Sequence, residues 1–381
     1  IGRTEYLKVI QTLTDLGFIT VDHSYKSQSF IDAYKKKRLN NGKSELKHLT
    51  PESKKYSLTD KSIGSIAKIG VLTSRMRAKI RKYKEYRIKK YAAIKTHNRI
   101  LNSITKVEFN PGNPKALKAL NDNKDTKTDK GKYYHEVYHE LQELNKLNSI
   151  NDLSKADSFY YTQSTKVNRV FHYQGTIPKA FRESLKLKSG GKLSEIDLKN
   201  SQPLIIALNY LNNSISKPDN EKLLNDVLTG NFYKSVANQA LKNGDDESYN
   251  LFTDNYGKFK AQVLGDGLYF NYIPQLEKAK PTERYLYQLY PSFMKYLRNK
   301  KRLKGYESVS IEAQLIESDM FIDKLFNSLT LQNVAIPVHD SIIVPTTEKN
   351  QYLDKIIDIF KSKFEYLDKT TIKSLFRITD Y

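Results

Sequence analysis

Two aspartates occupy positions from which they could hold divalent metal ions together. Asp197 lies near the end of the segment 194–198, which predicts a strand, and the apolar run 204–208 after it predicts a helix. Asp340 lies at the tip of a tight hairpin predicted between the short strands 334–338 and 342–344. Carboxylates on adjacent strands can hold two ions about 3.5–4 Å apart, a geometry that activates an attacking oxygen and stabilises a leaving phosphate. Each aspartate alone is typical of a cap or a turn, so the prediction depends on the pair.

The elements that must position this pair lie in the second half of the chain. From about residue 157 short strand and helix patterns alternate, with Pro and Gly at the joints, which predicts an α+β fold. Upstream, a helix pattern over 6–18 and a strand pattern over 18–21 are typical of a winged-helix module and equally of any small α+β cap. The segment 110–132, rich in Asn, Lys and Asp, predicts a flexible loop or hairpin tip.

A zinc-protease spacing occurs in a helix predicted over about 134–144. His135 and His139 stand in the H-E-x-x-H order that can bind zinc. No third-ligand motif follows, so two incidental histidines on a surface helix are the favoured interpretation. The apolar face of this helix is predicted to consist of Tyr134, Val137, Tyr138, Leu141 and Leu144.

Composition favours a polyanionic partner. Lys and Arg number 64 against 42 Asp and Glu, a net charge of +22, and nucleic acid is the natural partner of such a surplus. No apolar stretch approaches the roughly 20 residues that span a bilayer, and no signal-peptide pattern opens the chain, so we expect a soluble cytoplasmic protein without a membrane partner. The absence of cysteine excludes disulfides, thiolate zinc sites and iron–sulfur clusters. Because the chain starts at Ile1 rather than Met, we expect further sequence upstream.

One long helix is predicted to carry much of the positive charge. Between residues 68 and 99 there are twelve Lys or Arg and a single acidic residue. An apolar stripe predicts one packed face, formed by Ile69, Leu72, Met76, Ile80 and Tyr83. The opposite face predicts contact with phosphates rather than mere solvation. The residues expected to make it are Arg75, Arg77, Lys79, Arg81 and Lys82.

The order of several motifs over about 168–345 resembles family A DNA polymerases and the related single-subunit, phage-type RNA polymerases. The motifs that carry the likeness best are Asp-Leu-Lys-Asn-Ser-Gln-Pro from Asp197 and His-Asp-Ser-Ile from His339. The resemblance implies a right hand: an antiparallel palm sheet with helical thumb and fingers. It assigns 1–60 to a winged-helix-like region, 61–155 to a basic, helical, thumb-like region and 156–381 to the palm, with fingers inserted at about 211–305.

By this resemblance, Asp197 and Asp340 are the catalytic metal ligands. Arg169, which opens the segment before the first catalytic strand, would contact the minor groove of the primer–template. Gln202 falls where the DNA enzymes have a glutamate beside the sugar 2′ position, so deoxynucleotides are favoured. The other nucleic-acid-binding residues that the resemblance implies are Arg182, Gln314 and His339.

The predicted fingers helix departs from the family pattern. Lys260 resembles the lysine that contacts the incoming triphosphate, and Tyr269 resembles the aromatic residue that stacks near the base, although it lies one position late. Tyr256 stands where the family has an arginine, and Lys258 is expected to compensate. Ser341 replaces the glutamate of the DNA enzymes, as in the RNA enzymes, but two aspartates suffice to bridge two ions.

The sequence therefore predicts a nucleotidyltransferase, a DNA polymerase with primase activity that replicates a mobile genetic element. The motifs are closest to polymerase-like proteins of plasmids, phages and genomic islands, and are similar to the primase–polymerase of the staphylococcal cassette chromosome. We expect a bacterial or phage-encoded enzyme with two Mg²⁺ ions (or Mn²⁺ in their place). Its expected partners are a primer–template or single-stranded DNA, dNTPs or NTPs, and a small accessory protein. Two alternatives stay open: a phage-type RNA polymerase or primase, and a non-catalytic DNA-binding replication initiator.

Overall fold

A computed structural model describes residues 11, 19–22, 55–58, 74–156, 158–212 and 218–381. The chain divides into two compact units, Ile1–Lys82 and Tyr83–Tyr381. In the first unit, β1 (Ile19–Asp22) pairs antiparallel with β2 (Lys55–Leu58), which confirms the strand predicted around 18–21. Apart from Gln11, the helix expected before it lies outside the described residues, and with it the winged-helix interpretation.

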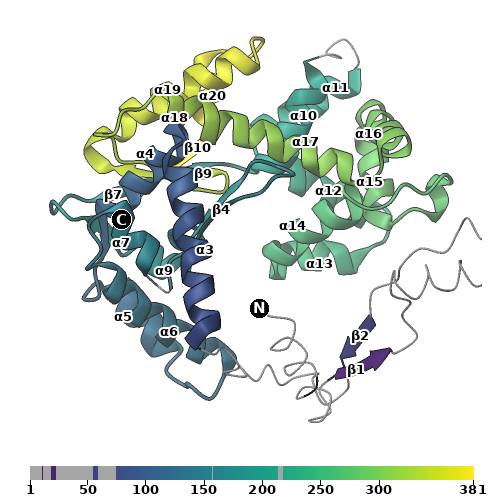
Figure 1. Cartoon of the computed structure of the whole chain (residues 1–381). Coiled ribbons are helices and arrows are strands. Elements are labelled where there is room, and N and C mark those ends of the chain that lie inside the picture. Colours follow the sequence, from purple (N-terminus) through teal and green to yellow (C-terminus); the bar gives the residue numbers. More distant parts are fainter. Residues whose placement is uncertain (1–10, 12–18, 23–54, 59–73, 157, 213–217) are drawn as a thin grey trace, which may run out of the picture. The chain divides into compact units, whose positions relative to one another are not determined.

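A four-stranded antiparallel sheet lies at the centre of the second unit (Figure 1). Its strand order is β10 (Phe376–Asp380), β7 (Leu193–Leu198), β9 (Ser341–Pro345), β8 (Ile336–Val338). The strands predicted on either side of the two aspartates are present as β7, β8 and β9, whereas no sequence pattern predicts β10. The expected α+β class is confirmed at this level: helices dominate and the sheets are small and antiparallel.

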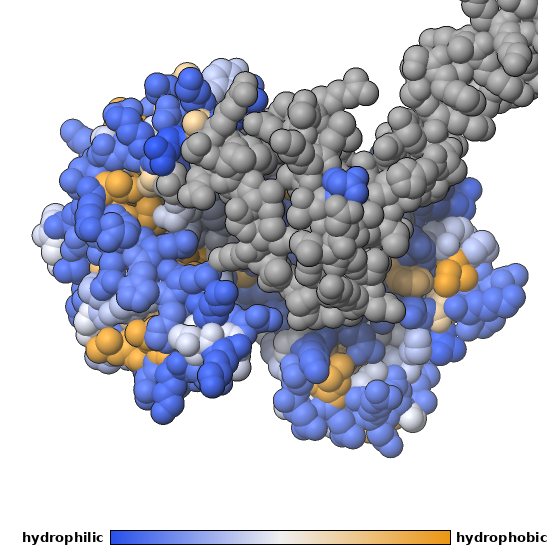
Figure 2. All heavy atoms as spheres, turned by 60° about the horizontal axis from the view of Figure 1, so that its bottom comes forward, coloured by the Kyte–Doolittle hydropathy of each residue, from blue (hydrophilic) through white to orange (hydrophobic). Residues whose placement is uncertain are grey.

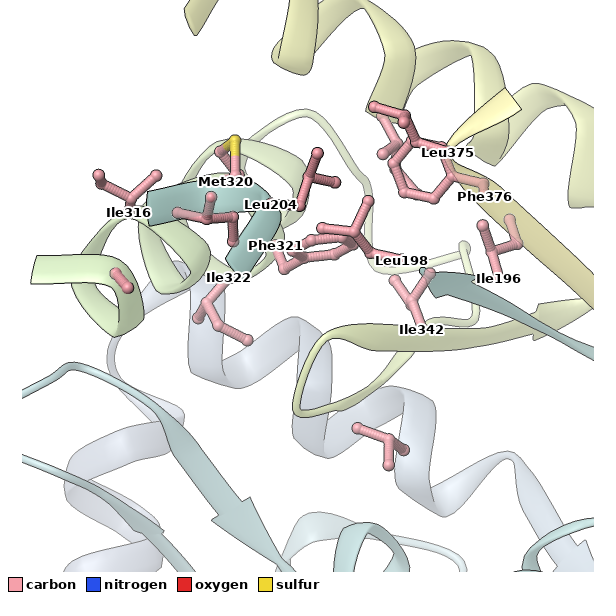
Figure 3. Close-up of a cluster of buried hydrophobic side chains, with 14 of the residues drawn as sticks. Ile196, Leu198, Leu204, Ile316, Met320, Phe321, Ile322, Ile342, Leu375 and Phe376 are labelled. Atoms are coloured by element: carbon pink, nitrogen blue, oxygen red, sulfur yellow. The ribbon is translucent and has the colours of Figure 1, made fainter. Parts of the chain in front are cut away.

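Helices cover the sheet and bury its apolar side chains. These helices are α10 (Ser201–Leu211), α17 (Glu307–Ser318), the π-helical turn η4 (Asp319–Lys324), α19 (Lys349–Lys363) and α20 (Lys369–Ser374). Figure 3 shows Leu198 and Ile342 of the sheet close to Phe321 of η4, and all three side chains are buried. Full burial of such a side chain contributes about 1.5–3 kcal/mol to folding. The strands that carry Asp197 and Asp340 therefore rest on a well-packed core.

Residues 95–187 form helices and two short strand pairs. The strand pairs are β3 (Val107–Phe109) with β6 (Leu185–Leu187) and β4 (Tyr161–Gln163) with β5 (Val170–His172). The helices are α4 (Lys95–Thr105), α5 (Pro114–Asp122), α6 (Asp129–Leu144), α7 (Ile150–Lys155), α8 (Tyr173–Thr176) and α9 (Lys179–Arg182). Val137, Leu141 and Leu144 of α6 are buried, as the periodicity predicts.

The prediction of a flexible loop over 110–132 is wrong. This segment contains α5 and the start of α6. Asn113 caps α5 by accepting a hydrogen bond from the Lys115 amide, and Pro114 occupies the first helical turn, where its missing N–H costs nothing. Ala116 is fully buried. A polar composition therefore conceals a short helix held by its cap and one small apolar contact.

The regular elements in the described part of the segment between α10 and α17 are all helices. It contains α11 (Pro218–Leu228), α12 (Phe232–Lys242), α13 (Asp246–Asp254), α14 (Tyr256–Gln262), the π-helical turn η2 (Val263–Leu268), η3 (Leu276–Lys278), α15 (Pro281–Leu289) and α16 (Pro291–Lys304). This is the part of the chain predicted as fingers. It is inserted between the strand that carries Asp197 and the hairpin that carries Asp340.

The basic helix α3 (Ser74–Ala92) is present, and the two residues of its predicted packed face whose side chains the structure describes are not packed. Ile80 and Tyr83 are 53% and 64% exposed, whereas Ile88, further along the helix, is 1% exposed. The packing of α3 is found near its C-terminal end, where the Arg87 guanidinium donates a hydrogen bond to the Tyr161 carbonyl of β4. Ile80 and Tyr83 therefore lie on the surface, whereas the side chains of Ile69, Leu72 and Met76 lie outside the described part of the chain.

The described surface is mostly polar. Figure 2 shows a face that is largely hydrophilic, with small and separate apolar patches. Within the described parts of the chain, no helix is long and apolar enough to cross a membrane.

Candidate active site

A cavity of about 600 Å³ lies beside the exposed ends of β7 and the β8–β9 hairpin. Four of the residues predicted from sequence line it together: Asp197, Gln202, Lys260 and Asp340. They come from three separate chain segments, namely the strand–helix turn after β7, helix α14 and the hairpin. The other lining residues include Asn200, Ser201, Gly230, Tyr233, Tyr256 and Arg377.

The sheet places the two aspartates next to each other. Asp197 is paired with Ser341 across the β7–β9 ladder, so Asp340 lies one residue beyond its partner. The Leu198 amide donates a hydrogen bond to the Asp340 carbonyl over 3.2 Å, which ties the hairpin tip to the end of β7. Because the ladder register sets both backbones, neither aspartate depends on a flexible loop.

The two carboxylates repel each other in a partly buried setting. Burial raises the pKa of Asp197 above its usual value, and the nearby Asp340 carboxylate raises it further. The Arg377 guanidinium of β10 opposes both effects by donating to Asp197 Oδ2 over 2.5 Å. The Ser201 hydroxyl donates to Asp340 Oδ2 over 2.5 Å. A further positive charge at this point would therefore weaken the repulsion between the Asp197 and Asp340 carboxylates.

The donor set fits a magnesium ion. Carboxylate oxygens are the hard ligands that Mg²⁺ prefers, and in phosphoryl-transfer sites one or two carboxylates usually suffice, with water and substrate phosphates as the other ligands. In the part of the chain that the structure describes, no group of three or more His, Cys, Asp or Glu side chains is arranged to hold a metal. Asp197 and Asp340 are the two acidic residues among those that line the cavity.

Three residues in the left-handed backbone region lie beside predicted site residues. Asn168 has φ 55°, Asn200 has φ 51° and His339 has φ 54°, and no other non-glycine residue of the described segments has positive φ. They stand next to Arg169, next to the Ser201–Gln202 turn and next to Asp340. Asn and His adopt this conformation more readily than most non-glycine residues, and residues held in it often occur at functional sites. The chain thus bends sharply three times to present this group of side chains.

A hydrogen-bonded chain surrounds the Gln202 amide. Its Oε1 accepts from the Tyr269 hydroxyl at 2.8 Å, and its Nε2 donates to Glu317 Oε2 at 2.7 Å. The other oxygen of Glu317 accepts from Arg169 Nε at 2.9 Å and Nη2 at 2.7 Å. Burial raises the pKa of Glu317 to about 7, although Arg169 opposes the rise. Glu317 was not among the predicted site residues, because an acid in a helical pattern is usually solvated.

Lys260 lies between two tyrosine rings at the edge of the cleft. Its Nζ is 5.2 Å from the Tyr233 ring centroid and 5.6 Å from that of Tyr256, and 3.4 Å from Asn200 Oδ1. Tyr256 therefore braces the lysine where the family pattern has a second cation. Lys258 is exposed and is not part of the cavity lining, so the structure does not bear out its expected compensating role in the cleft.

The remaining predicted residues lie near the cleft or on α3. Arg182 is 3.7 Å from Glu195, the exposed His339 has its ring 6.2 Å from that of Phe171, and Gln314 lies half-buried one turn before Glu317. On α3, Lys79, Arg81 and Lys82 are exposed. Arg75 and Arg77 belong to the helix, but their side chains lie outside the described part of the chain.

Arg377 and Ser201, like Glu317, were not predicted as site residues. Ser201 stands inside the Asp-Leu-Lys-Asn-Ser-Gln-Pro motif, so its proximity to Asp197 could have drawn notice. Arg377 follows Asp197 by 180 residues and pairs with it only because β10 lies beside β7. No spacing rule in the sequence indicates that contact.

No family model matches the chain, and no curated protein matches it. The likeness to polymerases therefore remains a resemblance of short motifs. The geometry of the cleft carries the functional proposal.

Proposed function

We propose that the second unit is a right-hand polymerase that catalyses template-directed nucleotidyl transfer, with the central sheet as its palm and residues 211–305 as its fingers. The protein would act as a DNA polymerase with primase activity in the replication of a mobile genetic element. One observation carries the proposal: Asp197, Gln202, Lys260 and Asp340, predicted separately as site residues, line a single cavity. A chance set of four residues from three segments would be scattered over the surface.

In this proposal Asp197 and Asp340 hold two Mg²⁺ ions. Mg²⁺ held by these two residues would supply positive charge that activates the primer 3′-hydroxyl and balances negative charge on the leaving pyrophosphate. The repulsion between the two carboxylates supports this assignment, since a bound divalent cation would relieve it. The hairpin and β7 hold the pair without a loop movement, which suits in-line attack on the α-phosphate.

Lys260 would bind the incoming triphosphate. Its two tyrosine neighbours limit its rotamers and keep the ammonium group at the edge of the cleft. A cation fixed in advance stabilises developing negative charge better than one that must reorganise. Arg377 also lines the cleft, and it could turn from Asp197 to a phosphate once the carboxylate holds a metal.

Ribonucleotide polymerisation is a second candidate function. Ser341 is buried and donates to Glu195 Oε1 over 2.5 Å, so the third hairpin residue brings no carboxylate to the cleft, and the RNA enzymes of the resembling family share this serine. Gln202 opposes this candidate because a long amide beside the sugar crowds a 2′-hydroxyl. A non-catalytic initiator is the weaker alternative, because it would not need both aspartates in one cavity.

The decisive test is extension of a labelled primer–template by the purified full chain with Mg²⁺ and either dNTPs or NTPs. An unprimed single-stranded template is run in parallel. We expect extension with dNTPs, and product on the unprimed template identifies primase activity. Preferential use of NTPs on both templates would favour the RNA polymerase.

Matched variants link the activity to the cleft. Asp197→Asn and Asp340→Asn keep the side-chain shape but lose the charge, and both should abolish extension. Asp358→Asn removes an exposed carboxylate on α19 that pairs only with Lys369 in the described contacts, and it should keep full activity. Tight DNA binding without extension by the wild-type protein under any condition would overturn the enzyme proposal in favour of the initiator.

A further inference from the structure

Glu317 is a buried carboxylate whose contacts all belong to the candidate nucleotide site. Its side chain is 1% exposed, and both of its oxygens accept hydrogen bonds. The bonds come from Gln202 on α10 and Arg169 before β5, two segments that are far apart in the sequence. Burying a charge is unfavourable unless it is paired, so a carboxylate retained at this point must be held for the groups it binds.

The contacts of Glu317 fix the orientation of the Gln202 amide. Glu317 Oε2 accepts from Gln202 Nε2, and Gln202 Oε1 accepts from the Tyr269 hydroxyl. With Glu317 ionised, turning the amide over would break the hydrogen bond to Glu317 and bring Oε1 against a carboxylate oxygen.

We propose, resting on the polymerase function proposed above, that Glu317 is a positioning residue for sugar selection, which holds the Gln202 amide as a fixed wall against the 2′ position of the incoming nucleotide. A ribose 2′-hydroxyl pressed against this wall would be crowded by the amide and would lose its water. Crowding and loss of hydration at one hydroxyl would weaken binding of a ribonucleotide about tenfold or more. A deoxyribose meets no such obstacle.

Sharing of the carboxylate couples this wall to Arg169. One Glu317 oxygen binds Gln202 and the other binds Arg169, so the two side chains keep a constant separation. Arg169 retains 21% exposure of its side chain and can contact a substrate while it is paired. Helix α17, which carries Glu317, thus holds the Gln202 and Arg169 side chains in place.

The test compares kcat/KM for a deoxynucleotide and its ribonucleotide on one primed template. Glu317→Leu removes the acceptor at nearly constant volume, and Glu317→Gln keeps one acceptor that cannot serve both partners. We expect the deoxy preference to fall about tenfold in Glu317→Leu and by a smaller factor in Glu317→Gln. The change should appear mainly as a lower KM for the ribonucleotide.

A double variant separates positioning from a general structural effect. If Glu317 acts through Gln202, then Gln202→Ala alone lowers the preference, and adding Glu317→Leu lowers it no further. Ser318→Ala is the matched control, because Ser318 is the next residue of α17 and loses a buried hydrogen bond to the Val167 carbonyl without touching Gln202. It should reduce thermal stability and leave the deoxy preference unchanged.

The possible failures are distinguishable. If the wild-type protein extends primers and Glu317→Leu slows both nucleotides equally, the inference is overturned while the polymerase function stands. A full additional loss of preference in the Gln202→Ala background overturns it in the same way. If the wild-type protein extends nothing, the polymerase proposal fails first, and the inference falls with it.

Discussion

The carboxylates and the cation of the cleft are held by two different kinds of structure. Asp197 and Asp340 belong to a sheet whose register sets their backbones and whose apolar face is buried. Lys260 belongs to α14, and its ammonium group is placed only by two tyrosine rings and a 3.4 Å contact to Asn200. Ligands that must bridge two ions need the first kind of support. A cation that meets a mobile triphosphate can be served by the second.

The largest loss of activity should follow from changing an aspartate held by the sheet. Asp340→Asn keeps the hairpin intact but removes one charge, and we expect primer extension to fall by about 10³-fold or more, because the metal-binding charge is lost. Steady-state incorporation of a single nucleotide measures it. An unchanged melting temperature shows that the fold is retained, and a loss of less than tenfold would mean that Asp340 is no metal ligand.

Changes on helix α14 should cause a smaller loss of activity, and only Lys260 should matter strongly. Lys260→Ala removes the braced cation, and we expect kcat/KM for the nucleotide to fall about 10²-fold. Lys258→Ala, two residues away and exposed, should change it by no more than about fivefold, as an exposed surface charge does. Equal losses in both variants would show that net charge and not position matters here.

A change of Arg377 tests whether its guanidinium competes with a metal ion for Asp197. In the structure its guanidinium binds Asp197 Oδ2, where it competes with a cation. Arg377 is 61% exposed, so the competition is weak, and Arg377→Gln should lower the Mg²⁺ concentration for half-maximal extension by about two- to fivefold. A higher Mg²⁺ requirement would instead show that Arg377 supports binding of the metal-bound triphosphate.

The smallest effect concerns stability without metal. The pKa of Asp197 is raised above 3.8 in the folded protein, so its contribution to stability is full below that pH and is lost as the pH rises through the raised value. Asp197→Asn does not titrate. Its melting temperature should therefore exceed that of the wild type by about 1–3 °C at neutral pH, and the gap should close on acidification. Thermal scans between pH 3 and 8 without divalent ions measure this, and a gap that widens in acid would contradict it.

The strands that carry the two aspartates can be predicted from the sequence. The segment that ends at Leu198 and the apolar runs around Asp340 predict β7, β8 and β9, because two-residue periodicity and a tight turn are local properties. Ile80 and Tyr83 of the predicted packed face of α3 are exposed, since periodicity shows that a helix has an apolar side but not that anything covers it. The loop predicted over 110–132 is partly helix, because a cap at Asn113 outweighs a polar composition.

The contacts that complete the site could not be read from the sequence. Arg377 reaches Asp197 through the pairing of β10 with β7, and Glu317 reaches Gln202 through the packing of α17 against α10. Both depend on tertiary structure that short motifs do not encode. An acidic residue in a helix gives the same pattern whether it is solvated or, like Glu317, buried behind a binding site.

The most direct test of the metal site is binding of Mn²⁺ followed by electron paramagnetic resonance. Mn²⁺ titrated into the purified full chain without nucleotide should lose its free-ion signal, and the double variant Asp197→Asn/Asp340→Asn should leave that signal unchanged. Asp358→Asn should behave as the wild type does. Equal Mn²⁺ binding by the wild type and the double variant would contradict the claim that these two aspartates hold the metal ions.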